Sequence, residues 1–307
     1  MREGITPSEP AVASGAVRQA AALPQPASLG TLVARGLRRS RSTLVGGGIV
    51  LAMVLVALLA PVLSPYDPLE INVPQRLLGP SAAHLMGTDN VGRDILSRVI
   101  YGARISLLVG SLVVACAAGA GIALGLTAGY SDRVDRVLMR ILDGLMAFPT
   151  TLLAIALMAA LGARLSNVII ALAVVFTPRV ARVVRSVTLV VRELDYVQAA
   201  QALGATDARI LARHILPNCL APVIVQSTFI FAESVLAEAA LSFLGVGLPP
   251  YIPSWGTIIT TGRMFMQTAA WITIFPGVAI LVTVLGLNLL GDGLRDLADP
   301  RLRGRLG

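Results

Sequence analysis

The sequence has no lysine: all 25 of its basic residues are arginines. The phosphate-binding loop of P-loop ATPases needs a lysine, so any ATP hydrolysis that this chain depends on must come from another chain. Cysteine and histidine are also scarce, with two of each. Because His84 and His214 are far apart, we predict no metal site, and we interpret Cys116 and Cys219 as small apolar packing residues.

Charge is scarce as well: 14% of the residues are charged and 55% are hydrophobic, which is unlike a soluble protein. The net charge of +8 does not indicate nucleic-acid binding, because the arginines are dispersed between apolar segments and aromatic residues are too few for a stacking platform. Several charge-free stretches reach the roughly 20 residues that a helix needs to cross a bilayer. A backbone in lipid must satisfy its own hydrogen bonds. The sequence therefore predicts an all-α integral membrane protein.

We predict six transmembrane helices and two tails. Residues 1–43, rich in Ala, Pro, Ser and Arg, are predicted to be a disordered tail, and residues 292–307 form the second tail. Between them, residues 64–103 make a polar connection and residues 188–218 a long loop. In the fourth helix we expect Pro178 to cause a kink, and Arg179 and Arg182 to reach the headgroups. The predicted helices are 44–63, 104–129, 140–161, 166–187, 219–242 and 269–291.

The distribution of arginine predicts the orientation. Most arginines outside the predicted helices fall in the two tails and in the loops at 130–140 and 188–217. Cytoplasmic segments carry the excess of basic residues. Both termini and the loop at 188–218 are therefore predicted to be cytoplasmic, and residues 64–103 extracytoplasmic.

The loop at 188–218 carries helical patterns. Ala199, Ala202 and Leu203 are expected to share one face of a first short helix, and Gly204 to supply a sharp turn after it. Without further information, this pattern is equally typical of an amphipathic hairpin that lies at the interface and has no partner.

A second short helix is predicted after Gly204. Thr206 or Asp207 is expected to cap it, and Pro217 to end it. On this helix one side is expected to be apolar, with the basic residues turned away from it; the apolar residues are Ile210, Leu211 and Ile215, and the basic residues are Arg209 and Arg213.

The same loop resembles the cytoplasmic signature of ABC importer permeases, in which Glu-Ala-Ala is followed by Gly and then by an apolar residue and Pro. The matching segments are Gln198-Ala199-Ala200, Gly204 and Ile215-Leu216-Pro217. In that family the segment forms a coupling helix that docks into a groove on the ATPase, so we name residues 188–218 the coupling loop. Gln198 stands where glutamate is usual, which puts the polarity of one contact in doubt. The resemblance implies that the ATPase contacts lie among Gln198, Ala199, Ala200, Gly204, Ala205, Asp207, Arg209, Arg213, His214 and Pro217.

Two further segments narrow the resemblance. Residues 84–106 are similar to the segment before the second span of C-type permeases from dipeptide, oligopeptide and nickel importers. Residues 238–249, with Pro253-Ser-Trp-Gly256, are similar to the exit of the fifth span in the same group. The likeness runs from about residue 46 to 300. It implies a type I ABC importer permease fold in the bacterial cytoplasmic (inner) membrane.

The resemblance also implies the partners and the cargo. The partners are a second homologous permease, two ATPase subunits that hold ATP and Mg, an extracytoplasmic substrate-binding protein, and membrane lipid. The resemblance further implies that this chain binds no cofactor of its own. The implied cargo is short peptides, with nickel chelates and haem left open.

In residues 84–106 the pattern indicates a turn followed by a helix. Thr88 or Asp89 is expected to cap this helix, with Asp89–Arg93 and Asp94–Arg98 as ion pairs at i, i+4. The segment either stabilises a helix on the membrane surface or helps to dock the binding protein.

Acidic residues inside predicted spans are costly and usually face a cavity or a partner. For Glu233 we weigh two hypotheses: it lines the substrate path, or it packs on a polar group of the partner permease. Glu238 is expected to make structural hydrogen bonds, and Asp143 to cap the third span. Small residues on the second span are expected to allow close helix packing: Gly110, Gly119, Gly121 and Gly125.

The main rival interpretation is a self-sufficient secondary transporter. Such proteins show internal repeats with broken helices, and the sequence has no convincing internal repeat. A membrane enzyme is disfavoured, because no nucleophile–base arrangement or metal cluster supports it.

Overall fold

The computed structural model describes residues 41–298, and all the regular elements within that range are helical except one isolated bridge. The predicted disordered tail lies outside the described residues except for its last three positions, and so does most of the second tail. The α-helices are α3 (Arg41–Leu58), α4 (Ala60–Leu63), α5 (Ile95–Tyr130), α6 (Asp132–Met146), α7 (Thr150–Leu161), α8 (Leu165–Val191), α9 (Asp195–Ala202), α10 (Asp207–Ile210), α11 (Leu216–Phe243), α12 (Trp255–Gly262) and α13 (Trp271–Ala298).

Five helical stretches are long and apolar enough to cross a membrane: α3, α5, α8, the stretch from α10 through α11, and α13. A sixth span forms if the pair α6–α7 counts as one. This pair corrects the predicted third span, because α6 and α7 are bent by 93° at their junction. Pro149 accounts for the break: it has no N–H to donate and it keeps Phe148 out of the helical conformation.

Two predicted helix boundaries were wrong. Helix α5 begins at Ile95 rather than near 104. Pro217 does not end the second helix of the coupling loop, since the helical stretch runs on from Asp207 to Phe243. A π-helical turn at Leu211–Ile215 lies between α10 and α11. Pro217 then falls in the first turn of α11, where a missing N–H costs little.

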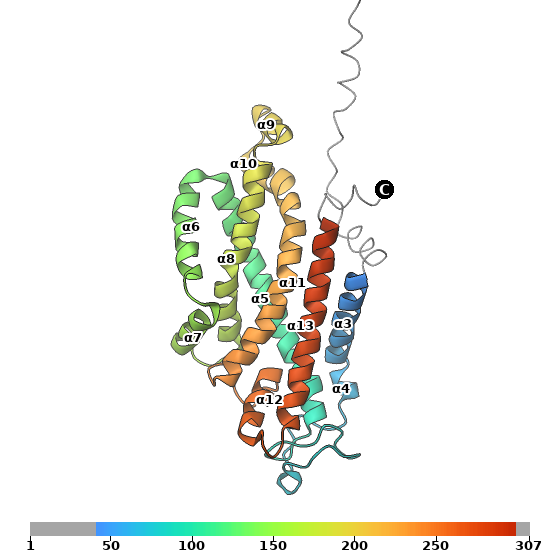
Figure 1. Cartoon of the computed structure of the whole chain (residues 1–307). Helices are drawn as coiled ribbons and strands as arrows, with labels where there is room; N and C mark the ends of the chain where they lie inside the picture. Colours follow the sequence, from blue (N-terminus) through green and yellow to red (C-terminus); the bar gives the residue numbers. More distant parts are fainter. Residues whose placement is uncertain (1–40, 299–307) are drawn as a thin grey trace, which may run out of the picture.

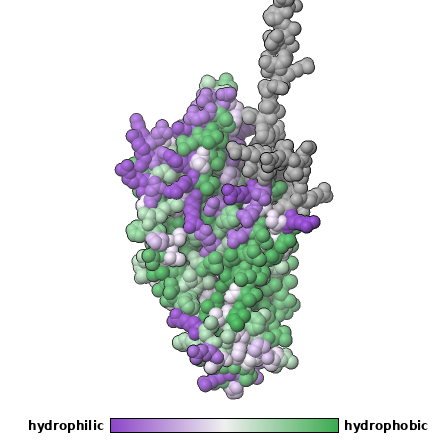
Figure 2. All heavy atoms as spheres, viewed as in Figure 1, coloured by the Kyte–Doolittle hydropathy of each residue, from purple (hydrophilic) through white to green (hydrophobic). Residues whose placement is uncertain are grey.

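The helices form an elongated bundle with two functional ends (Figure 1). Helices α9 and α10 lie at one end, toward which the beginning of α3 and the end of α13 also point (Figure 1); we call it the coupling end. Residues 64–94 and α12 lie at the opposite end, which we call the far end. Hydrophilic residues gather at both ends, and a hydrophobic band lies between them (Figure 2). This surface pattern fits a protein that crosses a bilayer.

Glycines on α5 allow it to pack closely against its neighbours. A Cβ at Gly121 would lie 2.5 Å from the Cβ of Val180, and one at Gly125 would lie 2.5 Å from the carbonyl oxygen of Ala181, both on α8. The ring of Phe231 on α11 covers Gly110 in the same way. The prediction of close packing is therefore confirmed at these three glycines. It was wrong at Gly119, which has open space around it.

This difference gives a matched test of helix packing. Gly121→Ala should destabilise the assembled protein by about 1–3 kcal/mol, because the added methyl group has no room against α8. Gly119→Ala, two residues away, should be neutral or slightly stabilising, because alanine favours helix. Thermal unfolding of the detergent-solubilised protein measures both. Equal melting temperatures for the two variants would contradict the proposed contact.

Candidate coupling site

Helix α9 ends in a tight turn at Gly204. The backbone φ of Gly204 is +82°, a conformation that favours glycine. The Gly204 N–H donates to the carbonyl of Gln201 at 2.9 Å, and the Ala205 N–H donates to the carbonyl of Ala200 at 3.0 Å. These two bonds make a Schellman motif, which satisfies the last carbonyls of the helix. The predicted sharp turn at Gly204 is confirmed.

The surface of this turn is open. Leu203 is 89% exposed, and Gln198, Ala199, Ala202 and Gly204 are also exposed. An exposed leucine at the tip of a helical turn offers an apolar contact to a partner. The apolar face predicted for α9 exists, but it points away from the bundle, and buried Val197 holds α9 to the core instead.

Buried isoleucines attach α10 and the π-helical turn to the bundle. Ile210 and Ile215 are fully buried in the main core cluster, and burying one such side chain from water contributes about 1.5–3 kcal/mol. Arg209 and Arg213 are exposed. The predicted division into an apolar and a basic side is therefore confirmed. Half-buried His214 lies with its ring 5.9 Å from that of Tyr196.

Tyr130, the last residue of α5, ties the two halves of the coupling loop together. Its hydroxyl donates to the Asp207 carboxylate at 2.7 Å and accepts from the Gln201 amide at 3.2 Å. Thr206 occupies the N-cap position of α10 but makes no side-chain capping bond, so the predicted cap lacks its hydrogen bond. The bond to the Asp207 carboxylate is charge-assisted, a type that contributes about 1.5–3 kcal/mol, although this one is exposed to solvent. Two fully buried isoleucines together contribute more, so they are the main attachment and Tyr130 adds a second one.

Arg192 makes a further link at the coupling end. Its guanidinium donates to the Gly129 carbonyl at 2.9 Å and to Asp132 at 3.1 Å. Hydrogen bonding to Asp132 raises the pKa of Arg192 above its usual value, so this cation keeps its charge. Sequence reasoning missed Tyr130, Arg192 and Val197, because their partners are distant in sequence.

Three arginines of α8 pair with acids on other helices. Arg182 donates to Asp143 at 2.6 Å, Arg185 makes two bonds to Asp135, and Arg179 pairs with Glu233 of α11. The expectation that Arg179 and Arg182 reach the headgroups was wrong, and so was the capping role of Asp143, which lies within α6. Each arginine has a carboxylate partner within the chain, so none of them needs the headgroups to balance its charge.

The predicted structural role of Glu238 is confirmed at the far end. Its fully buried carboxylate accepts from Ser254 at 2.8 Å and Ser242 at 2.9 Å, and from Ser106 at 3.5 Å. The indole N–H of Trp255 donates to the Val99 carbonyl at 3.0 Å. These contacts join α5, α11 and α12.

The segment before α5 corrects another prediction. Asp94, not Thr88 or Asp89, caps the helix, by accepting from the Ser97 N–H at 2.8 Å. Asp89–Arg93 is an ion pair at 2.6 Å, as predicted. Asp94 instead pairs with buried His84 at 2.9 Å, and Arg98 lies 3.8 Å from Asp89. Because Asp94 is occupied by the cap and by His84, it makes no ion pair with Arg98.

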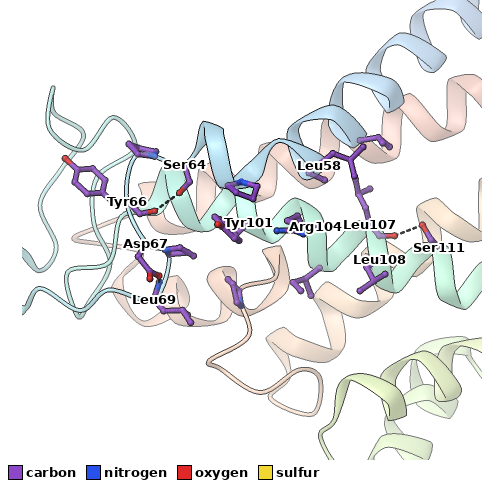
Figure 3. Close-up of a pocket in the computed structure, with 17 residues that line it drawn as sticks. Leu58, Ser64, Tyr66, Asp67, Leu69, Tyr101, Arg104, Leu107, Leu108 and Ser111 are labelled. Atoms are coloured by element: carbon purple, nitrogen blue, oxygen red, sulfur yellow. Dashed lines mark hydrogen bonds between the residues drawn. The ribbon is translucent and has the colours of Figure 1, made fainter.

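A cavity of about 1010 Å³ lies at the far end (Figure 3). Helices α3, α4 and α5 and the segment after α4 line it, with Tyr101 and Arg104 on one wall. No residue of α8 or α11 contributes, so this groove is separate from the coupling loop and from the charged face of α8. Within residues 41–298, no group of three or more His, Cys, Asp or Glu residues is arranged to hold a metal ion.

Comparison with known proteins identifies the family. Residues 121–304 match the binding-protein-dependent transport system inner membrane components, and residues 28–80 match the N-terminal transmembrane domain of oligopeptide transport permease C. A putative peptide transport system permease protein of Brucella suis is 52% identical over 272 residues, covering 89% of this chain and 92% of the relative. The dipeptide transport system permease protein DppC of Alkalihalophilus pseudofirmus is 46% identical over 268 residues, covering 87% and 88%.

The fold and the candidate coupling loop thus define the class of this protein, which is an integral membrane permease. The chain belongs to the family of binding-protein-dependent transport system inner membrane components, as a C-type permease subunit of an ABC importer. Permeases of this family are not catalytic. The family implies an ATPase, a binding protein and a partner permease.

Tyr130→Phe tests the second attachment of the coupling loop. The substitution removes both side-chain hydrogen bonds, so amide hydrogen exchange in α9 and α10 should accelerate by about 2–10-fold. Mass-spectrometric hydrogen exchange on the purified permease measures this. Tyr101→Phe, at the far end of the same helix, is the control and should leave exchange in these helices unchanged. Equal protection in wild type and Tyr130→Phe would contradict the role of Tyr130.

Proposed function

We propose that this chain forms one half of the translocation path of an importer for short peptides, and that ATPase subunits drive it through the coupling loop. The observation that carries the proposal is the exposed Schellman turn at Gly204, held on a helical stretch that continues into α11. A displacement of this turn passes directly into a membrane-spanning helix. Dipeptides or oligopeptides are the proposed cargo, because the relatives that this chain resembles at 44–52% identity are described as peptide, dipeptide or di/tripeptide permeases.

In this proposal, the ATPase contacts lie on the exposed side of the loop. Gln198, Ala199 and Gly204 present backbone and small side chains, and Arg209 and Arg213 add positive charge. Ala205 and Pro217 are half-buried and position the loop, and Asp207 is engaged by Tyr130. Ala200 and His214, also half-buried, lie at the edge of the surface.

The proposed orientation places the coupling end in the cytoplasm and the far end outside, where a substrate-binding protein delivers the peptide. The excess of arginine in the coupling-end segments supports this orientation. A homologous permease completes the path, because one chain exposes its charged α8 face. A secondary transporter needs no docking surface of this kind, so the exposed turn favours the ABC mechanism.

Gly204→Asp tests the coupling role. Aspartate at φ +82° strains the turn and places a charge on the docking surface, so peptide uptake should fall to background while the subunit still inserts and assembles. Gly245→Asp is a matched control, since Gly245 has the same φ of +82°, follows α11 in the same pattern of two backbone hydrogen bonds, and has equally open surroundings. Normal uptake by Gly204→Asp would refute the coupling role.

The orientation is tested by labelling single cysteines in a background with Cys116 and Cys219 replaced by alanine. Leu203 and Leu85 are both exposed, at 89% and 65%, on opposite ends. In spheroplasts, a membrane-impermeant maleimide should label Leu85→Cys and not Leu203→Cys. In inverted vesicles stripped of ATPase, the labelling should reverse. Labelling of Leu203→Cys in sealed spheroplasts would place the coupling loop outside and defeat the proposal.

A further inference from the structure

The ion pair between Arg179 and Glu233 lies in the middle of the membrane-spanning region. At 1.5 Å per residue, Arg179 is about 21 Å from the start of α8 and about 18 Å from its end. Glu233 is about 15 Å from the end of α11 by the same measure. Both residues therefore lie near the centre of a hydrocarbon layer about 30 Å thick.

This central pair is open on one side. The side chain of Arg179 is 31% exposed and that of Glu233 is 44% exposed. Charged groups at such depth face a water-filled cavity or the interior of an assembly, because exposure to lipid is too costly. The side of the pair that is open in this chain must therefore face the path or the second permease.

Cavities adjoin both members of the pair. One of about 250 Å³ is lined by Glu233 together with residues of α7, α8 and α11, and one of about 240 Å³ is lined by Arg179 together with the α6–α7 junction. Thr150 and Val175 line both cavities. The two cavities therefore lie next to each other; the one beside Glu233 is lined largely by apolar side chains, and the one beside Arg179 has a more polar lining.

A short peptide with free termini is a zwitterion, with an ammonium group at one end and a carboxylate at the other. We propose that Arg179 and Glu233 bind these termini during transit: Arg179 takes the carboxylate, Glu233 takes the ammonium group, and apolar walls accept the side chains. The inference rests on the proposed function. It explains why the chain keeps a charged pair at a depth where charge is costly, and why the cavity beside Glu233 has apolar walls that do not select a particular side chain.

The pair can exchange partners without leaving a charge bare. In the absence of peptide, Arg179 and Glu233 neutralise each other. A bound zwitterion replaces this single ion pair with two, one to each residue, so every ion keeps a counter-ion throughout. A neutral or singly charged ligand leaves one member of the separated pair unpaired, which is costly.

The test uses the complete importer, with both permeases, the ATPases and the binding protein, reconstituted in proteoliposomes. The binding protein is supplied saturated with alanyl-alanine, N-acetyl-alanyl-alanine or alanyl-alanine amide, so that its own selectivity does not limit the rate. The measured quantity is peptide transported per ATP hydrolysed. For the free dipeptide, Arg179→Gln and Glu233→Gln should each lower this ratio about tenfold, the factor carried by one charge-assisted hydrogen bond.

The blocked peptides separate binding from a structural role. Glu233→Gln should have little further effect on the acetylated peptide, which lacks the ammonium group that Glu233 would bind. Arg179→Gln should likewise have little further effect on the amide, which lacks the carboxylate that Arg179 would bind. Arg136→Gln, an exposed arginine of α6 outside the cavities, is the control and should leave the ratio within about twofold for all three peptides.

Two outcomes count against the inference. If Glu233→Gln lowers transport of the free and the acetylated dipeptide by the same factor, the pair is structural and the inference is overturned. The same holds if Arg179→Gln lowers transport of the free dipeptide and of the amide by the same factor. If Glu233→Gln assembles poorly, Glu233→Asp is used in its place. Because aspartate keeps the carboxylate, a complex with this variant must still transport more free dipeptide than acetylated dipeptide per ATP hydrolysed. A wild-type complex that hydrolyses ATP but moves no peptide refutes the proposed function instead, and is thereby distinguished from failure of the ion-pair site.

Discussion

The close contact between α5 and α8 holds the coupling end together. Gly121 and Gly125 let the two backbones approach until Val180 and Ala181 fill the space that side chains would otherwise take. This contact brings the end of α5 beside the end of α8, where Tyr130 and Arg192 make hydrogen bonds between segments distant in sequence. The coupling loop is built on this platform, so a larger residue at either glycine would disturb the loop without touching it.

In the proposed mechanism this platform stays in place, and the continuous stretch from α10 to α11 is the part that moves. Pro217 would be expected to interrupt a helix, yet the π-helical turn before it carries the chain through with little loss of hydrogen bonding. A loop that ended at Pro217 would be joined to the span by a flexible link. A continuous stretch moves as one body, so a displacement at the loop is carried into the membrane-spanning helix, as the proposed coupling requires.

The parts of this site that depend on local sequence could be predicted, and the parts that depend on distant contacts could not. The turn at Gly204 follows from one glycine between helical patterns, and the apolar side of Ile210 and Ile215 follows from their spacing. The ion pairs of α8 were missed because Arg179 and Glu233 are 54 positions apart and Arg185 and Asp135 are 50 apart. Asp94 was misassigned for a related reason: a carboxylate four residues before an arginine suggests a helix pair, but His84 and the helix cap occupy it first.

In the proposed mechanism, the far end of α11 is the fixed point that lets motion at the loop reach the centre of the membrane. Glu238 is hydrogen-bonded to Ser106 of α5 and to Ser254 before α12, which holds that end of the helix in place. If α11 pivots there, Glu233 lies about 7.5 Å from the pivot and Leu216 about 33 Å. A displacement of about 4 Å at Leu216 then moves Glu233 by roughly 1 Å, enough to exchange one hydrogen-bonded partner for another. The buried polar network thus sets the length of the lever, because loosening it would let α11 slide as a whole and would remove the difference in movement between its two ends.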